Sequence, residues 1–283
     1  MSGKKAKKER KEKREEEAEK TGGTPWQQKV LKGIQPNVLK PFGPSIGVFK
    51  LPPEFVQRMI RITDQVLEDK DRVDWGTNLV GQIAEEPWVS NQVLKDEECY
   101  EVFMGCLHSY VYNSLTQMGT ETEQVNVHLD HMWVVSQYKD EYNPVHYHTY
   151  CDLSAVMYLK SPNMEDRSKD GKLPAYKTQR DGQIELIYKS GDANALERGT
   201  FGMAPEPGTL LIFPSNLLHT VYPFKGPDER RSVAFNSHWQ AVTKDGKMID
   251  KGFRQPSDQD HPEAKARYKS KHVESHFAES KRK

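Results

Sequence analysis

From Val125 to about residue 240, short segments alternate apolar and polar residues, and this period of two constrains the fold most. Successive side chains of a strand point to opposite faces, so alternation is typical of strands with one buried face. Turn-forming residues separate the segments, and we expect about seven or eight strands here. The pattern predicts a mainly β fold with flanking helices (α+β), whose core is a double-stranded β-helix, or jelly roll.

Two stretches before this region repeat apolar residues at helical spacing. One helix is expected from Glu54 to about Asp69, and another from Asp96 to about Met118. Residues 26–47 are expected to form an irregular strand, and residues 72–90, 161–183 and 189–200 are expected to form loops. The chain is therefore divided into a disordered charged tail (1–24), a helical N-terminal support region (25–124), a double-stranded β-helix core (125–242) and a polar charged C-terminal tail (243–283).

The composition bears on whether the chain binds nucleic acid or a membrane and on its cellular compartment. The 283 residues carry 41 basic and 41 acidic side chains, so overall charge favours neither nucleic acid nor a membrane surface as a partner. No apolar run approaches the ~20 residues that span a bilayer, and no apolar signal core is seen at the N-terminus. Three cysteines without a CxxC motif indicate free thiols in a reducing compartment, so a cytoplasmic location is expected. The basic-then-acidic tail is interpreted as solubilising rather than as a nucleic-acid arm or nuclear import signal.

A His-x-His pair stands out in NPVHYHTYCDLSAVMYLK, residues 143–160. On one strand, His146 and His148 point the same way with Cα atoms roughly 6.6 Å apart, so both imidazoles can reach one metal ion. On spacing alone, two polar residues on a half-buried strand are the favoured interpretation of the pair. Two later segments change this balance: GTLLIFPSNLLHTVYPF (208–224) contains a third histidine, His219, and RRSVAFNSHW (230–239) opens on arginine.

This order of motifs resembles the 2-oxoglutarate- and Fe(II)-dependent oxygenases, in particular an uncharacterised phage- and bacterial-type branch near the prolyl hydroxylases. The resemblance covers about residues 127–240, and it implies the same double-stranded β-helix fold. It also implies Fe(II), 2-oxoglutarate and O2 as cofactors and cosubstrates. The metal ligands carried over by the resemblance are His146, His148 and His219, and no catalytic residue beyond them is expected. The second ligand departs from the family rule, which places a carboxylate at the position of His148.

Two other carboxylates compete for the role of metal ligand. His128-Leu129-Asp130 has the family's literal His-x-Asp spelling, but no matching strand follows it. Asp152 lies six residues after His146 and would be roughly 20 Å away on a continuous strand, so only a sharp turn would bring it close. Cys151 beside it is interpreted as a small buried residue. The triad of three histidines is preferred, with Asp152 left open.

The far carboxylate of 2-oxoglutarate calls for a cation with fixed geometry, and a guanidinium offers two parallel donors. The family's Arg-x-Ser spelling selects Arg230 and Ser232, while Arg231 then points to the opposite face of the strand. Tyr158 aligns with a family tyrosine that contacts this carboxylate, and Tyr138 aligns more loosely with a second one. Tyr158 could equally be a core aromatic residue, and for Tyr138 that interpretation is the stronger one.

The predicted function is that of a dioxygenase that hydroxylates an unidentified small-molecule, protein or peptide substrate while converting 2-oxoglutarate to succinate. A first alternative is a three-His, cupin-like dioxygenase that needs no 2-oxoglutarate; the neutral triad favours it and Arg230 opposes it. A second alternative is a non-catalytic jelly-roll binding module with a degenerate metal site.

Overall fold

The computed structural model describes residues 24–34, 37–39, 43–163, 180–189 and 199–249. Nearly all of the predicted tail at residues 1–24, most of the C-terminal tail, and large parts of the two predicted loops after residue 160 lie outside the described residues. The helices are α2 (Pro25–Gly33), α3 (Pro53–Glu68), η1 (Gly76–Asn78), α4 (Asn91–Asp96) and α5 (Tyr100–Gln117). The strands are β1 (Asn37–Leu39), β2 (Ile46–Lys50), β3 (Trp88–Val89), β4 (Thr122–Gln137), β5 (Asn143–His146), β6 (Leu153–Lys160), β7 (Ile184–Ile187), β8 (Thr200–Met203), β9 (Thr209–Pro214), β10 (Leu218–Val221) and β11 (Arg230–Thr243).

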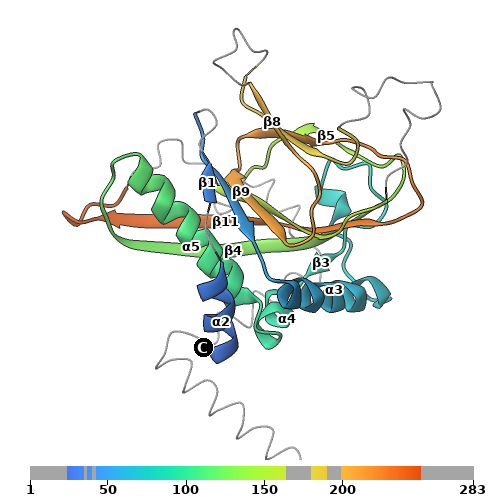
Figure 1. Cartoon of the computed structure of the whole chain (residues 1–283), viewed down its shortest axis with the longest axis horizontal. Coiled ribbons are helices and arrows are strands. Elements are labelled where there is room, and N and C mark those ends of the chain that lie inside the picture. The colour runs from blue at the N-terminus through green and yellow to red at the C-terminus, as the bar shows by residue number, and fades with distance from the viewer. Residues whose placement is uncertain (1–23, 35–36, 40–42, 164–179, 190–198, 250–283) are drawn as a thin grey trace, which may run out of the picture.

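The strands form two antiparallel sheets, as Figure 1 shows. The large sheet has the order β1-β2-β9-β6-β11-β4-β3, and the small sheet has the order β5-β10-β7-β8. Within the described part of the chain, eight strands, β4 to β11, follow Thr122, in agreement with the strand count expected from the sequence. The predicted fold class, mainly β with a jelly-roll core and flanking helices, is confirmed.

Alternation along the central strands gives the large sheet two buried faces. On β9, Leu210 and Ile212 pack in the cluster that includes the helices, whereas Leu211 and Phe213 pack in the cluster shared with the small sheet. The same division separates Met157 from its neighbour Tyr158 on β6. The side facing the small sheet holds the pocket described below. Alternate residues of these strands therefore face either the helices or the pocket side.

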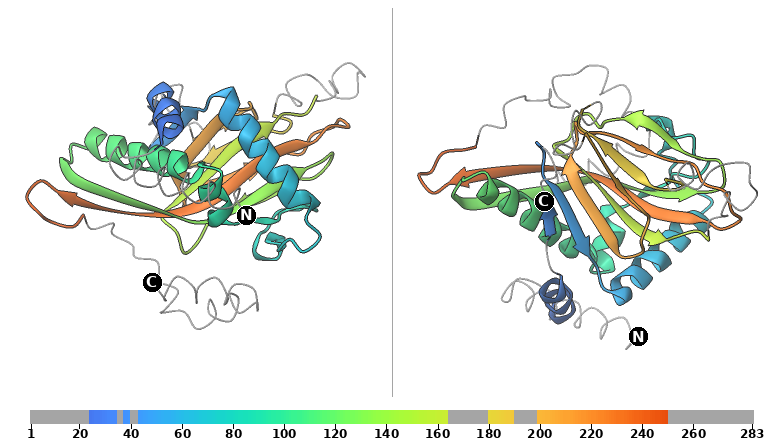
Figure 2. Two further views of the ribbon diagram at one scale, coloured as in Figure 1. Left: turned by 90° about the horizontal axis from the view of Figure 1, so that it is seen from below. Right: turned by 45° about the horizontal axis from the view of Figure 1, so that its top comes forward.

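The helices lie on one face of the large sheet, which is clearest in Figure 2. Helix α3 begins with Pro53 in its first turn and buries a stripe that includes Phe55, Met59 and Ile62. Helix α5 contributes a second stripe, and the Phe103 ring packs edge-on against those of Phe55 and Phe235. Both predicted helices are therefore present, with ends close to the predicted ones.

The N-terminal support region departs from the expected arrangement in two places. Residues 25–33 form helix α2 rather than part of an irregular strand, because Thr24 and Gln27 form a reciprocal capping box and Pro25 occupies the first turn. Strands β2 and β3 pair with β9 and β4, so this region also completes the large sheet. The boundaries proposed at residues 24, 124 and 242 stay predictions.

All three cysteines are buried and unbridged, as expected for free thiols. In the described residues, we find no helix whose length and apolar content would suit a membrane span.

Candidate metal centre

Two paired strands of the small sheet bring the first and third histidines together. His146 is the last residue of β5 and lies opposite His219 of β10 in the antiparallel register. The register shifts between His219 and Val221, so a bulge follows the pair directly. The imidazole centroids of these two residues are 4.2 Å apart. Strand pairing thus joins residues that are far apart in the sequence.

His148 reaches the same point from beyond the end of β5. Its backbone N–H donates to the Ser215 carbonyl oxygen at 2.9 Å, which holds the chain extended beside the turn between β9 and β10. Its Nδ1 atom lies 2.6 Å from Oδ1 of Asn236 on β11. The His148 ring centroid is 5.3 Å from that of His146 and 5.1 Å from that of His219. The described residues contain one group of potential metal-ligating side chains of this kind, and its ligand atoms all lie within 4.8 Å of one another.

Hydrogen bonds orient all three imidazoles. Nδ1 of His146 lies 2.7 Å from the Pro144 carbonyl oxygen, and Nδ1 of His219 lies 2.9 Å from that of Leu217. A carbonyl oxygen only accepts, so Nδ1 carries the proton in both rings and Nε2 keeps its lone pair. The Asn236 amide oxygen selects the same tautomer for His148. Fixed tautomers with available Nε2 atoms are characteristic of metal-binding histidines.

Burial keeps the three rings neutral. Desolvation lowers the pKa of His146, and it lowers the pKa of His148 to about 4. The pKa of His219 falls well below its usual value through burial and through the two neighbouring imidazoles. Neutral imidazole is the form that binds a metal ion, so the site needs no proton release from these rings at neutral pH.

Arg230, the predicted ligand of 2-oxoglutarate, is buried in the core at 1% exposure. Its Nη1 donates to Oε1 of Gln137 at 3.0 Å, and its Nε donates to the Gly182 carbonyl oxygen at 3.1 Å. No carboxylate among the described residues forms an ion pair with it. A buried cation without a counter-ion is costly, and burial lowers the pKa of this guanidinium. The arrangement fits a site for an anionic ligand.

Two further polar groups beside Arg230 also lack partners. The guanidinium carbon lies 5.1 Å from the ring centroid of Tyr158, and Ser232 is paired with Tyr158 across β11 and β6. The Tyr158 hydroxyl, the Ser232 hydroxyl and Nη2 of Arg230 are buried, with no hydrogen-bond partner among the described residues. Burial raises the pKa of Tyr158, so the hydroxyl keeps its proton and can donate. These three donors fit the carboxylate that the sequence analysis assigns to them.

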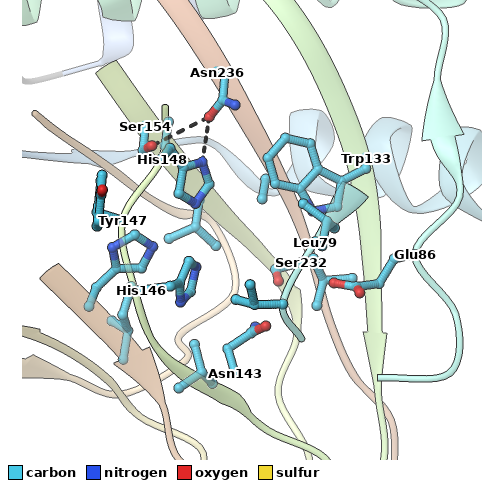
Figure 3. Close-up of a pocket in the computed structure, with 18 of the residues that line it drawn as sticks. Leu79, Glu86, Trp133, Asn143, His146, Tyr147, His148, Ser154, Ser232 and Asn236 are labelled. Atoms are coloured by element: carbon cyan, nitrogen blue, oxygen red, sulfur yellow. Dashed lines mark hydrogen bonds between the residues drawn. The ribbon is translucent and has the colours of Figure 1, made fainter. Parts of the chain in front are cut away.

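One pocket joins the histidines to Arg230 and Ser232, with Tyr158 buried behind its wall. It has a volume of about 140 Å³, enough for several water-sized groups, and lies between the two sheets. His146, His148, His219, Arg230 and Ser232 line it, together with apolar side chains. Figure 3 shows His146 and His148 on one side of this pocket and Ser232 on the other, with the hydrogen bond from His148 to Asn236.

Tyr138 does not reach the pocket, and this prediction requires correction. Its side chain is 45% exposed and is absent from the pocket wall, while its backbone N–H donates to Oε2 of Glu141. The preceding residue, Gln137, ends β4 with a fully buried side chain that contacts Arg230. Because neighbouring residues face opposite sides, Gln137 occupies the inward position and Tyr138 points outward.

The two competing carboxylates lie elsewhere. Oδ2 of Asp152 accepts from the Trp239 backbone N–H at 3.0 Å and lies 3.2 Å from Nδ1 of His238. The turn at Tyr150, which has a φ of 59°, precedes Asp152, whose side chain faces His238 and Trp239 of β11 rather than the triad. His128 is an exposed residue of β4, 3.7 Å from Asp130, and neither belongs to the three-histidine group. The histidine group therefore contains no carboxylate within the described residues.

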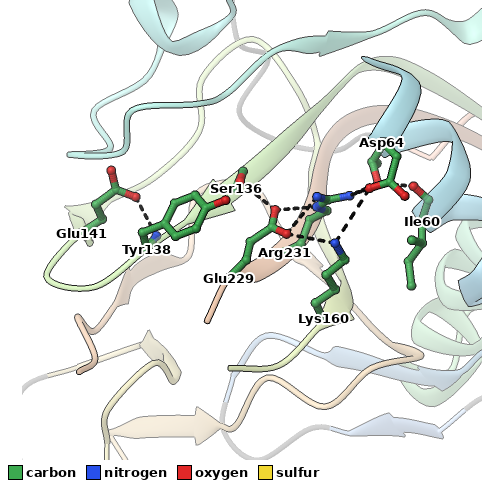
Figure 4. Close-up of polar contacts among 9 residues, drawn as sticks. Ile60, Asp64, Ser136, Tyr138, Glu141, Lys160, Glu229 and Arg231 are labelled. Atoms are coloured by element: carbon green, nitrogen blue, oxygen red, sulfur yellow. Dashed lines mark hydrogen bonds and ion pairs between the residues drawn. The ribbon is translucent and has the colours of Figure 1, made fainter. Parts of the chain in front are cut away.

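Arg231 faces the helices, on the opposite side of β11 from the pocket. It forms ion pairs with Glu229 and Asp64, and Lys160 lies 3.0 Å from the same glutamate, as Figure 4 shows. Although burial raises the pKa of Glu229, hydrogen bonds from Arg231, Ser136 and Lys160 hold it below its usual value. The adjacent arginines thus differ sharply: Arg231 is compensated by carboxylates, and Arg230 is not.

Three residues of this site were missed from the sequence. Asn236 belongs to the FN of the last motif, which could have indicated it as the partner of His148. Gln137 carries no motif. Glu86 lines the pocket from a segment that was expected to be only a loop.

Comparisons with known proteins agree with this geometry. Residues 131–236 match a family model described as a putative 2OG-Fe(II) oxygenase. No curated protein sequence matches the chain.

Solved structures with low similarity include a Pseudomonas putida prolyl-4-hydroxylase (15% identity, 74% of this chain and 98% of that chain, TM-score 0.41). They also include the viral collagen prolyl hydroxylase of Paramecium Bursaria Chlorella virus-1 (13%, 68% and 94%, TM-score 0.42). A third is a Trichoplax adhaerens prolyl hydroxylase in complex with a hypoxia inducible factor peptide fragment (14%, 75% and 88%, TM-score 0.44). These likenesses are too distant to carry an argument about activity.

The matched segment contains the three histidines, Arg230, Ser232 and Tyr158. The cofactors that the family description implies, Fe(II) and 2-oxoglutarate with O2, are those predicted from the sequence. Over residues 131–236, the chain is similar to the 2OG-Fe(II) oxygenase family.

Proposed function

We propose that the chain binds Fe(II) through Nε2 of His146, His148 and His219, and 2-oxoglutarate through Arg230, Tyr158 and Ser232. With both bound, it hydroxylates an organic substrate. Fe(II) and 2-oxoglutarate supply the oxidising chemistry: one oxygen atom of O2 enters succinate, the other enters the substrate as a hydroxyl group, and 2-oxoglutarate loses CO2.

The observation that carries this proposal is the unpaired cation at Arg230. A site that held only a metal ion would have no use for a buried guanidinium whose Nη2 lacks a partner, beside two hydroxyls that also lack partners. A dicarboxylate that reaches the metal with one end would supply the missing acceptors with its other end. The charge-assisted hydrogen bonds formed there are about twice as strong as neutral ones.

The protein's own residues have two tasks in this reaction. Pro144, Asn236 and Leu217 provide the oxygen atoms that hold the imidazoles in the metal-binding tautomer. The apolar side chains of the wall, among them Phe213 and Val156, exclude water from the reacting groups. Neither task requires a proton to move at a side chain, in keeping with the absence of a predicted general acid or base.

A three-His dioxygenase that needs no 2-oxoglutarate is the second candidate. The three-histidine triad favours it, because the 2-oxoglutarate-dependent oxygenases normally have a carboxylate as one of the three ligands. Three neutral imidazoles do not offset the charge of the metal ion as that carboxylate does. Arg230 opposes it for the reason given above.

The two candidates separate in one experiment. The purified chain is incubated with Fe(II), O2 and 2-oxoglutarate, and succinate is measured against reactions lacking either iron or 2-oxoglutarate. We expect slow succinate formation even without substrate, dependent on both additions. Oxygen consumption with a small organic acid or thiol but no succinate would favour the second candidate, and absence of any bound stoichiometric metal would indicate a non-catalytic binding module.

A further inference from the structure

Glu86 is a buried carboxyl group in the pocket wall that the proposed function does not use. It lies between η1 and β3, in a segment that runs along β4 at the edge of the large sheet. The Ser136 backbone N–H donates to the Glu85 carbonyl oxygen at 3.1 Å, and the Val134 N–H donates to that of Pro87 at 2.9 Å. These bonds fix the backbone on both sides of Glu86, so the direction of its side chain is set by the sheet edge.

Adjacent glutamates of this segment have opposite environments. Glu85 points outward and lies 3.4 Å from a guanidinium nitrogen of Arg72. Glu86 points inward, is 2% exposed and lines the pocket. Its Oε2 atom has no hydrogen-bond partner, and no basic side chain in the described part of the chain forms an ion pair with it. Glu85 is compensated by a cation within the chain, whereas Glu86 has none.

Gly81 packs closely against the side chains of Glu86 and Asn143. A Cβ atom at Gly81 would lie 3.1 Å from Oε2 of Glu86 and 2.5 Å from Oδ1 of Asn143, so any side chain there would crowd both oxygens. Asn143 also lines the pocket. Figure 3 shows the Glu86 carboxyl group turned toward the pocket interior, across from His146 and His148. Two oxygen acceptors therefore lie close together at the pocket wall.

The surrounding charge favours a cation at this part of the pocket. Burial, with smaller contributions from the carboxylates of Asp74 and Glu141, raises the pKa of Glu86 to about 7. A positively charged group beside Glu86 would relieve both effects, whereas an anion would worsen them. The neighbouring pocket wall at Leu79, Val80 and Trp133 is apolar and suits an aliphatic chain.

We propose that Glu86 is the substrate-recognition residue of this pocket and that it binds a positively charged nitrogen, an amine or guanidinium group carried on an aliphatic chain. This inference rests on the proposed function, since it makes the occupant of the Glu86 side the substrate of the oxygenase. The pocket then sorts its two ligands by charge: the buried guanidinium of Arg230 takes the dicarboxylate, and Glu86 takes the cation.

The test uses matched pairs of small probes on the full chain. N-acetyl-lysine N-methylamide is compared with its norleucine counterpart, and N-acetyl-arginine N-methylamide is compared with its citrulline counterpart. Each pair differs in the charged nitrogen group. Binding is measured by calorimetry without added iron or 2-oxoglutarate, so the readout does not depend on turnover. Glu86→Gln keeps the shape of the side chain and removes its charge, and Glu85→Gln makes the same change on the outward neighbour.

In at least one pair, we expect the cationic probe to bind the wild-type chain about 10- to 100-fold more tightly than its neutral counterpart. Glu86→Gln should abolish this preference and Glu85→Gln should retain it. Equal binding within both pairs, no binding of either cation, or a preference that survives in Glu86→Gln would overturn the proposal. If Glu86→Gln fails to fold, equal binding within both wild-type pairs still overturns the proposal. Succinate formation by the wild type reports separately on the proposed function, so the two can fail independently.

Discussion

Replacing Glu86 by glutamine should change how the stability of the protein depends on pH. In the folded chain the pKa of Glu86 rises from 4.5 to about 7, mainly through burial. Between these two values the unfolded chain has lost the proton and the folded chain still holds it, so the wild-type fold loses stability as pH rises. Each pKa unit corresponds to about 1.4 kcal/mol, which gives a loss of about 3 kcal/mol that is complete above the folded pKa.

Glutamine cannot ionise, so Glu86→Gln should escape this loss. We expect the free energy of unfolding of the variant, relative to the wild type, to increase by about 3 kcal/mol between about pH 4.5 and about pH 8. Near pH 8 this corresponds to a melting temperature higher by roughly 6–12 °C. The measurement is urea unfolding followed by tryptophan fluorescence, with metal removed by a chelator. The buried histidines titrate in both proteins, so their contribution cancels in the difference.

Glu85→Gln is the control, because Glu85 faces outward beside Arg72 and should show a much smaller pH-dependent difference. A difference for Glu86→Gln that stays constant with pH would refute the reasoning. A wild type that gains stability over the variant as pH rises would refute it more strongly, since the carboxylate would then be stabilised by a cation in the folded chain.

Three further substitutions, two of them with a control variant, test the proposed ligands. His219→Ala should abolish metal binding and succinate formation with the fold retained, while His108→Ala, at an exposed site on α5, should do neither; metal analysis and circular dichroism check this. Arg230→Ala should raise the 2-oxoglutarate concentration for half-maximal binding about 10- to 100-fold, measured by anaerobic calorimetry. Arg231→Ala should leave that value unchanged but cost about 3 kcal/mol of stability in urea unfolding, and swapped results would contradict the assigned strand faces. His148→Asp restores the family carboxylate and should bind Fe(II) at least as tightly through direct attraction, whereas loss of both metal and turnover would favour a true three-His site.

The β core could be predicted because local pattern and tertiary burial agree there. Leu210 to Phe213 on β9 are apolar on both faces, as a strand between helices and a second sheet requires. His146 and His219 were found because a short motif marks each of them, although only the register of β5 with β10 makes them neighbours. Helix α2 was missed although its capping residues, Thr24 and Gln27, are visible in the sequence; proline and glycine nearby outweighed that signal.

The rest depends on contacts that no local pattern encodes. The inward face at the end of β4 belongs to Gln137 rather than Tyr138, and this is fixed by pairing with β11 along fourteen residues of that strand. Glu86 reads as an ordinary loop glutamate in the sequence, because its burial comes from the path of its segment along β4. The sequence alone therefore does not indicate that Glu86 is buried in a pocket wall.

The most direct test of the central claim is a crystal structure of the chain grown without oxygen in the presence of Fe(II) and 2-oxoglutarate. We predict iron bound to Nε2 of His146, His148 and His219, with 2-oxoglutarate at the metal and its far carboxylate hydrogen-bonded to Nη2 of Arg230 and the hydroxyl of Tyr158. Iron held by another set of side chains, or 2-oxoglutarate bound without contact to Arg230, would contradict the account.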